Sequence, residues 1–320
     1  MQNETLGVVI FAYNRPANFS KLLDSIIESE NSKEFEYFIY IDGPKANENL
    51  EVIREVCKLA DSFKDKVGES KVSIISRSAN IGLAQSVIQG VTEVFKNKSK
   101  AIILEDDLIL SKKSLIYFSR ALDIYVNEPK VGAICGYVPF ELHSQESTFF
   151  LNEASSWGWA TWSDRWKEAN WNSKYLYEEI INSNKVYEFD SLGTYPFTEM
   201  LSLQNNQKID SWAIRWQANL FLDNKLCLYP KESLINNLGF RGVGTHGTKD
   251  RRYEVKVCQD FDVNIQPIVI EENSEARAAL SNFYFRLNSN SGTRSRIIKL
   301  LVKVKRMLNN LLNLIFRQEC

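Results

Sequence analysis

Three consecutive acids, Glu105, Asp106 and Asp107, directly follow the apolar run Ala101–Leu104. Adjacent carboxylates repel one another and are costly to bury unless a cation neutralises them. Mg²⁺ and Mn²⁺ prefer oxygen ligands and leave positions open for phosphate oxygens. The segment therefore predicts a divalent-cation site, or else a solvated acidic turn before a helix over about 111–126. Strand alternation places Glu105 and Asp107 on one side and Asp106 on the other.

Other polar residues also follow apolar runs directly. They are Asn14 and Arg15 after Leu6–Ala12, Asp42 after Phe35–Ile41, and Arg77, Asn80 and Gly82 after Val72–Ser76. The carboxyl ends of parallel strands meet at one edge of a sheet, and ligands bind beyond that edge. We therefore expect these residues to lie near the three acids.

Helical patterns separate the apolar runs in the first half of the chain. Apolar residues recur at three- and four-residue steps over about 17–29, 48–63 and 83–95. This alternation predicts an α/β fold, with a mostly parallel Rossmann-like sheet flanked by helices. The second half has a Trp-rich segment (156–171), an amphipathic helix over about 208–224 and a Gly-rich loop (236–247). We expect both halves to share one sheet.

The composition is that of an ordinary folded protein. Of 320 residues, 44% are hydrophobic and 25% are charged, and the net charge of -1 argues against a nucleic-acid partner. Five scattered cysteines predict neither a zinc site nor a disulfide framework. Neither a signal-peptide pattern nor an uncharged apolar run of about 18 residues is present, so we expect a cytoplasmic protein without a spanning helix.

The C-terminal segment differs from the rest in charge. Residues 294–320 carry a net charge of +6. Because the whole chain carries a net charge of -1, residues 1–293 carry -7. Within 294–317, apolar residues recur at helical spacing and basic residues occupy the other faces. This pattern predicts an amphipathic helix that lies on an anionic membrane surface, which would place the protein on the inner face of the cell membrane. The alternative is a helix that packs on the protein itself or in a dimer.

Several motifs resemble, in order, those of GT-A glycosyltransferases, which use nucleotide sugars. V-V-I-F-A-Y-N-R-P, Y-I-D-G-P, R-S-A-N-I-G-L-A and L-E-D-D-L resemble the family's first strand, second strand, ribose-side segment and DXD-type acidic motif. K-I-D-S-W-A-I-R-W, L-Y-P and N-N-L-G-F-R-G-V-G-T-H resemble acceptor-side segments of the N-acetylglucosaminyltransferase I-like subgroup and of bacterial surface-polysaccharide enzymes. The resemblance covers about residues 6–247.

The resemblance implies a role for each matched position. Residues 1–130 would be the nucleotide-sugar-binding half, 131–293 the acceptor-side half of the same domain, and 294–320 a separate basic helix. The UDP-sugar donor would meet Ala12, Asn14, Arg15, Asp42, Arg77, Asn80, Gly82, Glu105 and Asp106. Asp107 and His246 would hold Mn²⁺ or Mg²⁺, Asp210 would be the catalytic base, and Trp157, Gly158 and Trp159 would contact donor sugar or acceptor.

The implied reaction is an inverting transfer from a UDP-sugar to a carbohydrate or glycolipid acceptor, in surface polysaccharide assembly. A carboxylate would take the proton of the acceptor hydroxyl, and the metal would offset charge on the departing diphosphate. Asp210 could instead be a simple helix N-cap, and His246 a solvated loop residue. The alternatives for the whole chain are a sugar nucleotidylyltransferase and a non-catalytic carbohydrate-binding protein. A nucleotidylyltransferase carries a Gly-rich basic loop after its first strand. This chain has A-Y-N-R-P there, which argues against that alternative.

Overall fold

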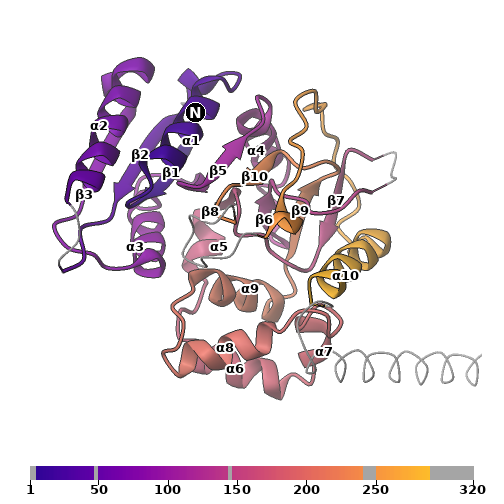
Figure 1. Cartoon of the computed structure of the whole chain (residues 1–320). Coiled ribbons are helices and arrows are strands. Elements are labelled where there is room, and N and C mark those ends of the chain that lie inside the picture. Colours follow the sequence, from indigo (N-terminus) through magenta and orange to yellow (C-terminus); the bar gives the residue numbers. More distant parts are fainter. Residues whose placement is uncertain (1–4, 47–49, 143–145, 241–249, 289–320) are drawn as a thin grey trace, which may run out of the picture.

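The computed structural model describes residues 5–46, 50–142, 146–240 and 250–288. At its centre is an eight-stranded sheet with the order β3-β2-β1-β4-β8-β6-β9-β7 (Figure 1). The strands are β1 (Gly7–Ala12), β2 (Glu36–Ile41), β3 (Val72–Ser76), β4 (Lys100–Glu105), β6 (Val131–Cys135), β7 (Thr148–Leu151), β8 (Trp159–Trp162) and β9 (Leu226–Pro230). Only β8 and β7 run against the other strands of this sheet. The structure confirms the predicted α/β fold with a mostly parallel sheet.

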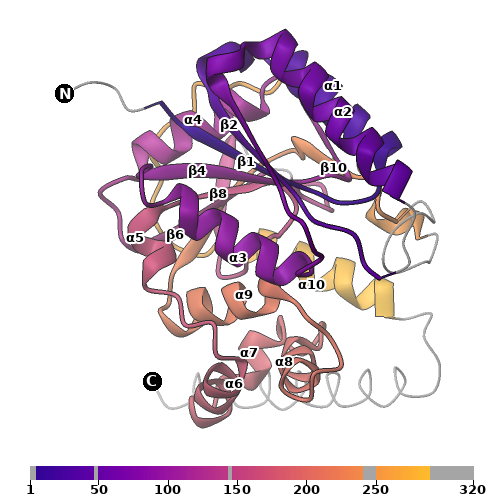
Figure 2. The ribbon, with the colours of Figure 1, turned by 90° about the vertical axis from the view of Figure 1, so that its left-hand side faces the viewer.

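Helices cover both faces of the sheet, as Figure 2 shows. On one face lie α1 (Pro16–Ile27), α2 (Leu50–Val67) and α4 (Ser114–Ile124). On the other lie α3 (Leu83–Val94), α5 (Ser163–Lys167), α9 (Trp212–Leu222) and α10 (Ser274–Asn288). Strand β1 is buried along its whole length because its side chains alternate between these two layers.

A third layer packs against the outer side of α9. It consists of α6 (Ser173–Asn182), α7 (Val186–Phe189) and α8 (Phe197–Asn205), at the bottom of Figure 1. These helices share their own apolar cluster with Ile214, Ala218 and Phe221 of α9. Helix α9 is therefore buried on two sides, which fixes the position of its N-terminus relative to the sheet.

A two-stranded antiparallel sheet joins the acidic motif to the second half of the chain. It is formed by β5 (Leu108–Leu110) and β10 (Ile235–Asn237), in which Leu108 faces Asn237. The backbone N–H of Leu238 also donates to the carbonyl oxygen of Asp107 at 2.7 Å. The segment 237–240 is therefore held beside the acids.

The predicted strands and helices of the first half are present within a few residues of their expected bounds. In the second half, the Trp-rich segment contains β8, which lies between β4 and β6 in the middle of the sheet. No helix in the described part of the chain is long and apolar enough to cross a membrane. Two expectations, His246 and the amphipathic helix over 294–317, lie outside the described residues.

Candidate active site

The carboxyl ends of β1, β2, β3 and β4 meet at one edge of the sheet. Ala12 pairs with Ile41, Ile41 with Ser76, and Phe11 with Glu105. A cavity of about 480 Å³ opens at this edge and is lined from both halves of the chain. It brings together most of the residues singled out in the sequence, namely Ala12, Arg15, Asp42, Asn80, Gly82, Glu105, Asp106, Asp107 and Trp157.

Arg15 contacts the two acids that follow β4. Its Nη1 donates to Asp107 Oδ2 at 2.8 Å and lies 3.4 Å from Asp106 Oδ1. The backbone N–H of Tyr13 donates to the other oxygen of Asp106 at 3.2 Å. Strand β4 ends at Glu105, so Asp106 and Asp107 form a turn and do not continue the alternation expected from the sequence. The turn is why both can face the same arginine.

The acidic motif has an unusual electrostatic environment. Asp106 and Asp107 are only 7% and 8% exposed. Burial, followed by the charge of Asp107, raises the pKa of Asp106 to about 7 although Arg15 lowers it. Burial and the charges of Asp107 and Asp106 raise the pKa of Glu105 to about 8, while a hydrogen bond from the Trp212 side chain lowers it. Among the described residues, Arg15 therefore lowers these pKa values by less than burial and the neighbouring acids raise them.

Asp42 organises the loops above β2 and β3. Its Oδ1 accepts hydrogen bonds from the backbone N–H groups of Gly43 and Ile81, and its Oδ2 accepts one from Gly82, all at 2.9–3.0 Å. Asn80 Nδ2 donates to the carbonyl oxygen of Gly43 at 3.0 Å. A Cβ at Gly43 would lie 2.5 Å from backbone atoms of Ala79, so this close approach of the two loops requires glycine. Asp42 thereby fixes the backbone that lines one side of the cavity.

Gly239 approaches the acids from the second half of the chain. A Cβ built there would overlap Asp107 Oδ2 and would lie 3.0 Å from Asn237 Oδ1. The Gly239 backbone N–H donates to that Asn237 oxygen at 2.7 Å. The missing side chain therefore leaves room for the Asp107 carboxylate.

The residues present fit a cation that is shared with a substrate. In residues 5–46, 50–142, 146–240 and 250–288, no group of three or more His, Cys, Asp or Glu side chains is arranged to hold a metal ion alone. Mg²⁺, however, is usually held by one or two carboxylates together with substrate phosphates. Asp107, with Asp106 beside it at the edge of the cavity, offers carboxylate oxygens of this kind.

Asp210 lies at the start of α9, just before its N-cap Ser211. Its Oδ1 accepts a hydrogen bond from the largely buried Arg215 at 3.1 Å, and its side chain is 53% exposed. Its Oδ2 lies 3.8 Å from the position that a Cβ on Gly82 would take. Asp210 does not line the cavity itself, but it stands beside Gly82, which does. Ser211, and not Asp210, caps the helix with its side chain.

Four other residues singled out in the sequence do not line the cavity: Asn14, Arg77, Gly158 and Trp159. Arg77 instead donates to Gln89 Oε1 at 3.0 Å and lies over the ring of Tyr40. Trp159, expected beside a sugar, is 1% exposed and lies in the core. It stacks on Trp212 at 5.3 Å between ring centroids, because β8 occupies the middle of the sheet. Of the two tryptophans, Trp157 is the one at the cavity.

The cavity also includes residues that the sequence did not single out. Lys45 lines the side near Asp42 and lies 5.7 Å from the centroid of the Tyr13 ring. It follows the turn Asp42-Gly43-Pro44, so its place could have been found from that motif. Glu153 and Tyr253 line the other end of the cavity and belong to no local motif. Only the tertiary structure brings them there.

Residues 7–182 match the family model described as glycosyl transferase family 2. The match spans more than half of the chain and includes β1 to β4 with the acidic motif. The class of protein is therefore that of the glycosyltransferases. The chain belongs to glycosyl transferase family 2.

Among solved structures, the fold is similar to that of S. aureus TarS 1–349, with 11% identity, a TM-score of 0.41 and coverage of 74% of this chain and 61% of that chain. The mannosyltransferase PcManGT from Pyrobaculum calidifontis, in complex with GDP-Man and Mn²⁺, has 13% identity and a TM-score of 0.38, with 68% and 74% coverage. GalNAc-T7 with UDP, GalNAc and Mn²⁺ has 9% identity and a TM-score of 0.46, with 72% and 43% coverage. The chain thus spans less than two thirds of TarS 1–349 and of GalNAc-T7. No curated protein matches it in sequence.

Proposed function

We propose that this family 2 protein transfers a sugar from a UDP-sugar to a carbohydrate or glycolipid acceptor, with a divalent cation and with inversion at the anomeric carbon. One observation carries the proposal. At the ends of β1 and β4, Arg15 meets Asp106 and Asp107, and all three line one cavity to which both halves of the chain contribute. Residues 1–130 would supply the donor side, and residues 131–293 the acceptor side.

On the donor side, cations and carboxylates share one wall of the cavity. Arg15 and Lys45 supply positive charge for a diphosphate, which binds cationic side chains well. Asp42 and Asn80 would hold the loop under the nucleotide, with the backbone of Ala12 and Gly82 close to it. Asp106 would contact the ribose or a metal-bound water, and Glu105 would support it from the end of β4.

Asp107 is the proposed protein ligand of Mn²⁺ or Mg²⁺, and His246 would be a second one. A bound divalent cation would offset the charge that grows on the departing diphosphate. Arg15 already contacts the same carboxylate and would remain beside that diphosphate. The arrangement keeps positive charge close to the bond that breaks.

Asp210 is the proposed general base. Inverting transfer needs a carboxylate that removes the proton of the acceptor hydroxyl while its oxygen attacks the anomeric carbon. Arg215 holds one oxygen of Asp210, and the other oxygen lies toward Gly82 at the rim of the cavity. One oxygen is therefore oriented by the protein, while the other is directed to the side where donor and acceptor would meet.

The basic segment 294–317 is proposed to hold the enzyme on an anionic membrane surface, where glycolipid or polysaccharide acceptors are made. Each basic residue near such a surface contributes about 1 kcal/mol. In liposome flotation, the full chain should bind vesicles that contain an anionic lipid, and a chain ending at residue 293 should not. Equal partitioning of the two proteins would contradict this role.

The test of the proposed function uses nucleotides alone. Isothermal titration calorimetry with UDP, UDP-GlcNAc and GDP-Man should show binding of a UDP compound that is tighter in MnCl₂ than in EDTA. Slow hydrolysis of the bound UDP-sugar should also require Mn²⁺. Absence of nucleotide binding under both conditions would refute the proposal, and formation of pyrophosphate from UTP and a sugar 1-phosphate would support a nucleotidylyltransferase instead.

A further inference from the structure

The cavity continues beyond the acids into a compartment with aromatic walls. Trp157, Phe240 and Tyr253 line it and pack against one another, with centroid distances of 5.2 Å (Trp157–Phe240), 5.4 Å (Trp157–Tyr253) and 4.5 Å (Phe240–Tyr253). They come from the turn before β8, the segment after β10 and the 3-10 helix Arg251–Tyr253. Three distant segments thus form one continuous aromatic surface.

A second group of rings extends this surface. Phe283 lies 5.8 Å from Tyr253 and 5.7 Å from Tyr284, and Tyr284 lies 4.5 Å from Tyr195. All of these residues line the same cavity as Asp107. We call the six rings the aromatic chamber: Trp157, Tyr195, Phe240, Tyr253, Phe283 and Tyr284. None of the six rings is among the residues proposed above for the donor side.

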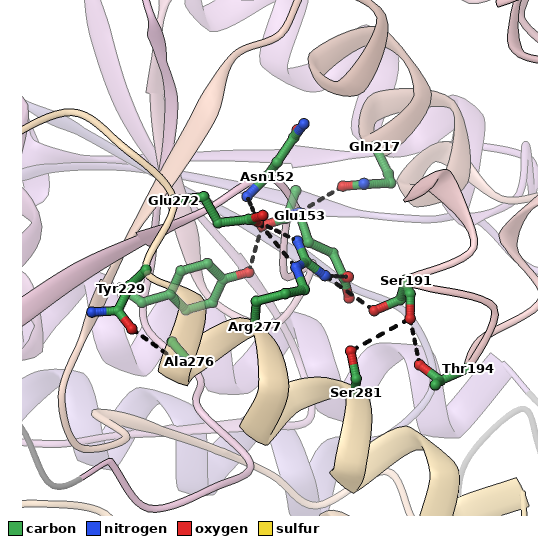
Figure 3. A network of polar contacts seen from close by, with 12 residues as sticks. Asn152, Glu153, Ser191, Thr194, Gln217, Tyr229, Glu272, Ala276, Arg277 and Ser281 are labelled. Atoms are coloured by element: carbon green, nitrogen blue, oxygen red, sulfur yellow. Dashed lines mark hydrogen bonds and ion pairs between the residues drawn. The ribbon is translucent and has the colours of Figure 1, made fainter. Parts of the chain in front are cut away.

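One carboxylate stands among these rings. Glu153 lines the cavity, is 3% exposed and belongs to the polar network in Figure 3. Its Oε2 accepts a hydrogen bond from Arg277 Nη1 at 2.8 Å, and its Oε1 accepts one from the Tyr284 hydroxyl at 2.6 Å. A carboxylate has about four acceptor positions. Contacts within the described residues use two of them, so Glu153 can accept further hydrogen bonds.

The network orients Glu153 without cancelling its charge. Arg277 is shared with a second acid, since its Nη2 and Nε also donate to Glu272 Oε1 at 2.7 and 3.0 Å. Two acids therefore face one arginine. A third partner is Ser191, whose hydroxyl accepts a hydrogen bond from Arg277 Nη1 at 3.1 Å and fixes the guanidinium further. The result is a rigid hydrogen-bond acceptor with residual negative charge.

These features select one class of ligand. Aromatic faces pack well against the C–H faces of a sugar ring, and an oriented carboxylate accepts hydrogen bonds from sugar hydroxyls. A lipid chain would leave the Glu153 carboxylate against hydrocarbon, which is costly. An anionic group would be repelled by the same charge. A neutral sugar satisfies both the rings and the carboxylate.

Building on the proposed function, we propose that the aromatic chamber is the acceptor subsite, that it takes a neutral sugar ring, and that Glu153 sets its specificity by accepting hydrogen bonds from the sugar's hydroxyls. A site built to bind a hydroxyl discriminates strongly against ligands without it, because its own polar group is then left unpaired. Deoxy analogues should therefore bind poorly.

The experiment uses saturation-transfer NMR with the octyl β-glycosides of glucose, galactose and N-acetylglucosamine. The wild-type protein should transfer saturation to ring protons of at least one glycoside. Glu153→Gln should weaken that glycoside's affinity about tenfold or more, the scale of a lost hydrogen bond to a charged group. Tyr253→Leu should weaken it through the aromatic surface, independently of the ionic network.

Glu272→Gln is the matched control, because it removes the same charge from the same arginine but does not line the cavity. It should leave glycoside affinity unchanged. Saturation confined to the octyl chain, no binding by the wild-type protein, or equal losses in Glu272→Gln and Glu153→Gln would each overturn the proposal. A UDP titration of the wild-type protein distinguishes failure of the acceptor-subsite proposal from failure of the proposed function, because UDP probes only the donor side.

Discussion

Arg15 Nη1 lies 2.8 Å from Asp107 Oδ2, although the two residues are 92 positions apart in the sequence. Parallel pairing of β1 with β4 produces this contact, because the ends of the two strands lie side by side. The same guanidinium nitrogen is 3.4 Å from Asp106. Arg15 therefore occupies the place at which a cation would neutralise the acids.

This contact predicts that Mn²⁺ and Arg15 partly replace each other in stabilising the fold. Arg15→Gln removes the guanidinium that contacts both buried acids and should lower the free energy of unfolding by about 1–3 kcal/mol in EDTA. Addition of Mn²⁺ should raise the melting temperature more in this variant than in the wild-type protein. Arg54→Gln, which changes an arginine with 62% side-chain exposure, is the control. If Mn²⁺ raised the melting temperature equally in the wild-type protein, Arg15→Gln and Arg54→Gln, the result would count against the cation site.

Gly239→Ala should impair catalysis without unfolding the protein. The new Cβ would overlap the Asp107 carboxylate and displace it. A displacement of about 1 Å in an active site can cost roughly 10²-fold in rate. Steady-state transfer rates and a melting curve measure the two effects separately. Gly7→Ala serves as the control, because its nearest contact would be an ordinary 3.4 Å to Phe38. Wild-type activity in Gly239→Ala would show that the position of Asp107 is not critical.

Trp212→Phe should destabilise the protein through Glu105. The Trp212 side chain hydrogen-bonds Glu105 and stacks on Trp159. Phenylalanine keeps an aromatic ring but removes the N–H donor. The Glu105 carboxyl then lacks this hydrogen bond, at a cost of about 1–3 kcal/mol. Trp216→Phe is matched to it, since in the described part of the chain the Trp216 Nε1 is buried without a hydrogen-bond partner. Urea unfolding should show the greater loss in Trp212→Phe, and equal losses would exclude a role for the hydrogen bond.

Asp210→Asn should retain UDP-sugar affinity but lose roughly 10²–10⁴ in transfer rate, the usual effect of removing a general base. Asparagine still accepts a hydrogen bond from Arg215, so α9 should keep its position. Asp223→Asn, at the other end of α9, should transfer at the wild-type rate. NMR coupling constants of the product should show an inverted anomeric centre. Retained configuration, or full activity in Asp210→Asn, would refute the assignment of the base.

The first half of the fold could be predicted because each of its strands and helices is indicated by the pattern of a short stretch of sequence. Each strand of β1 to β4 is an apolar run with a polar end, and α1 to α3 have helical periodicity. The acids were harder to place. Continued alternation put Asp106 opposite Asp107, but β4 ends at Glu105 and the turn directs both acids toward Arg15. Strand propensity alone does not report where a strand stops.

The second half was less predictable because its structure depends on distant contacts. Strand β8 is only four residues long and buried on both faces, so it has no alternating pattern. Trp159, which begins this strand, was expected at a sugar but lies in the core. Glu153, Tyr253 and Tyr284 come from three segments without a recognisable motif, and only packing of α10 against the sheet brings them together.

The role of Asp107 in binding the divalent cation is tested most directly by a calorimetric titration of Asp107→Asn with UDP, in MnCl₂ and in EDTA. Asp123→Asn, which changes an exposed acid on α4, is the control, and circular dichroism should show that both variants are folded. If Asp107 holds the metal, UDP should bind the wild-type protein and Asp123→Asn more tightly in Mn²⁺, whereas the affinity of Asp107→Asn should be the same with and without the metal. An increase in UDP affinity with Mn²⁺ in Asp107→Asn as large as in the wild-type protein would show that Asp107 is not the ligand.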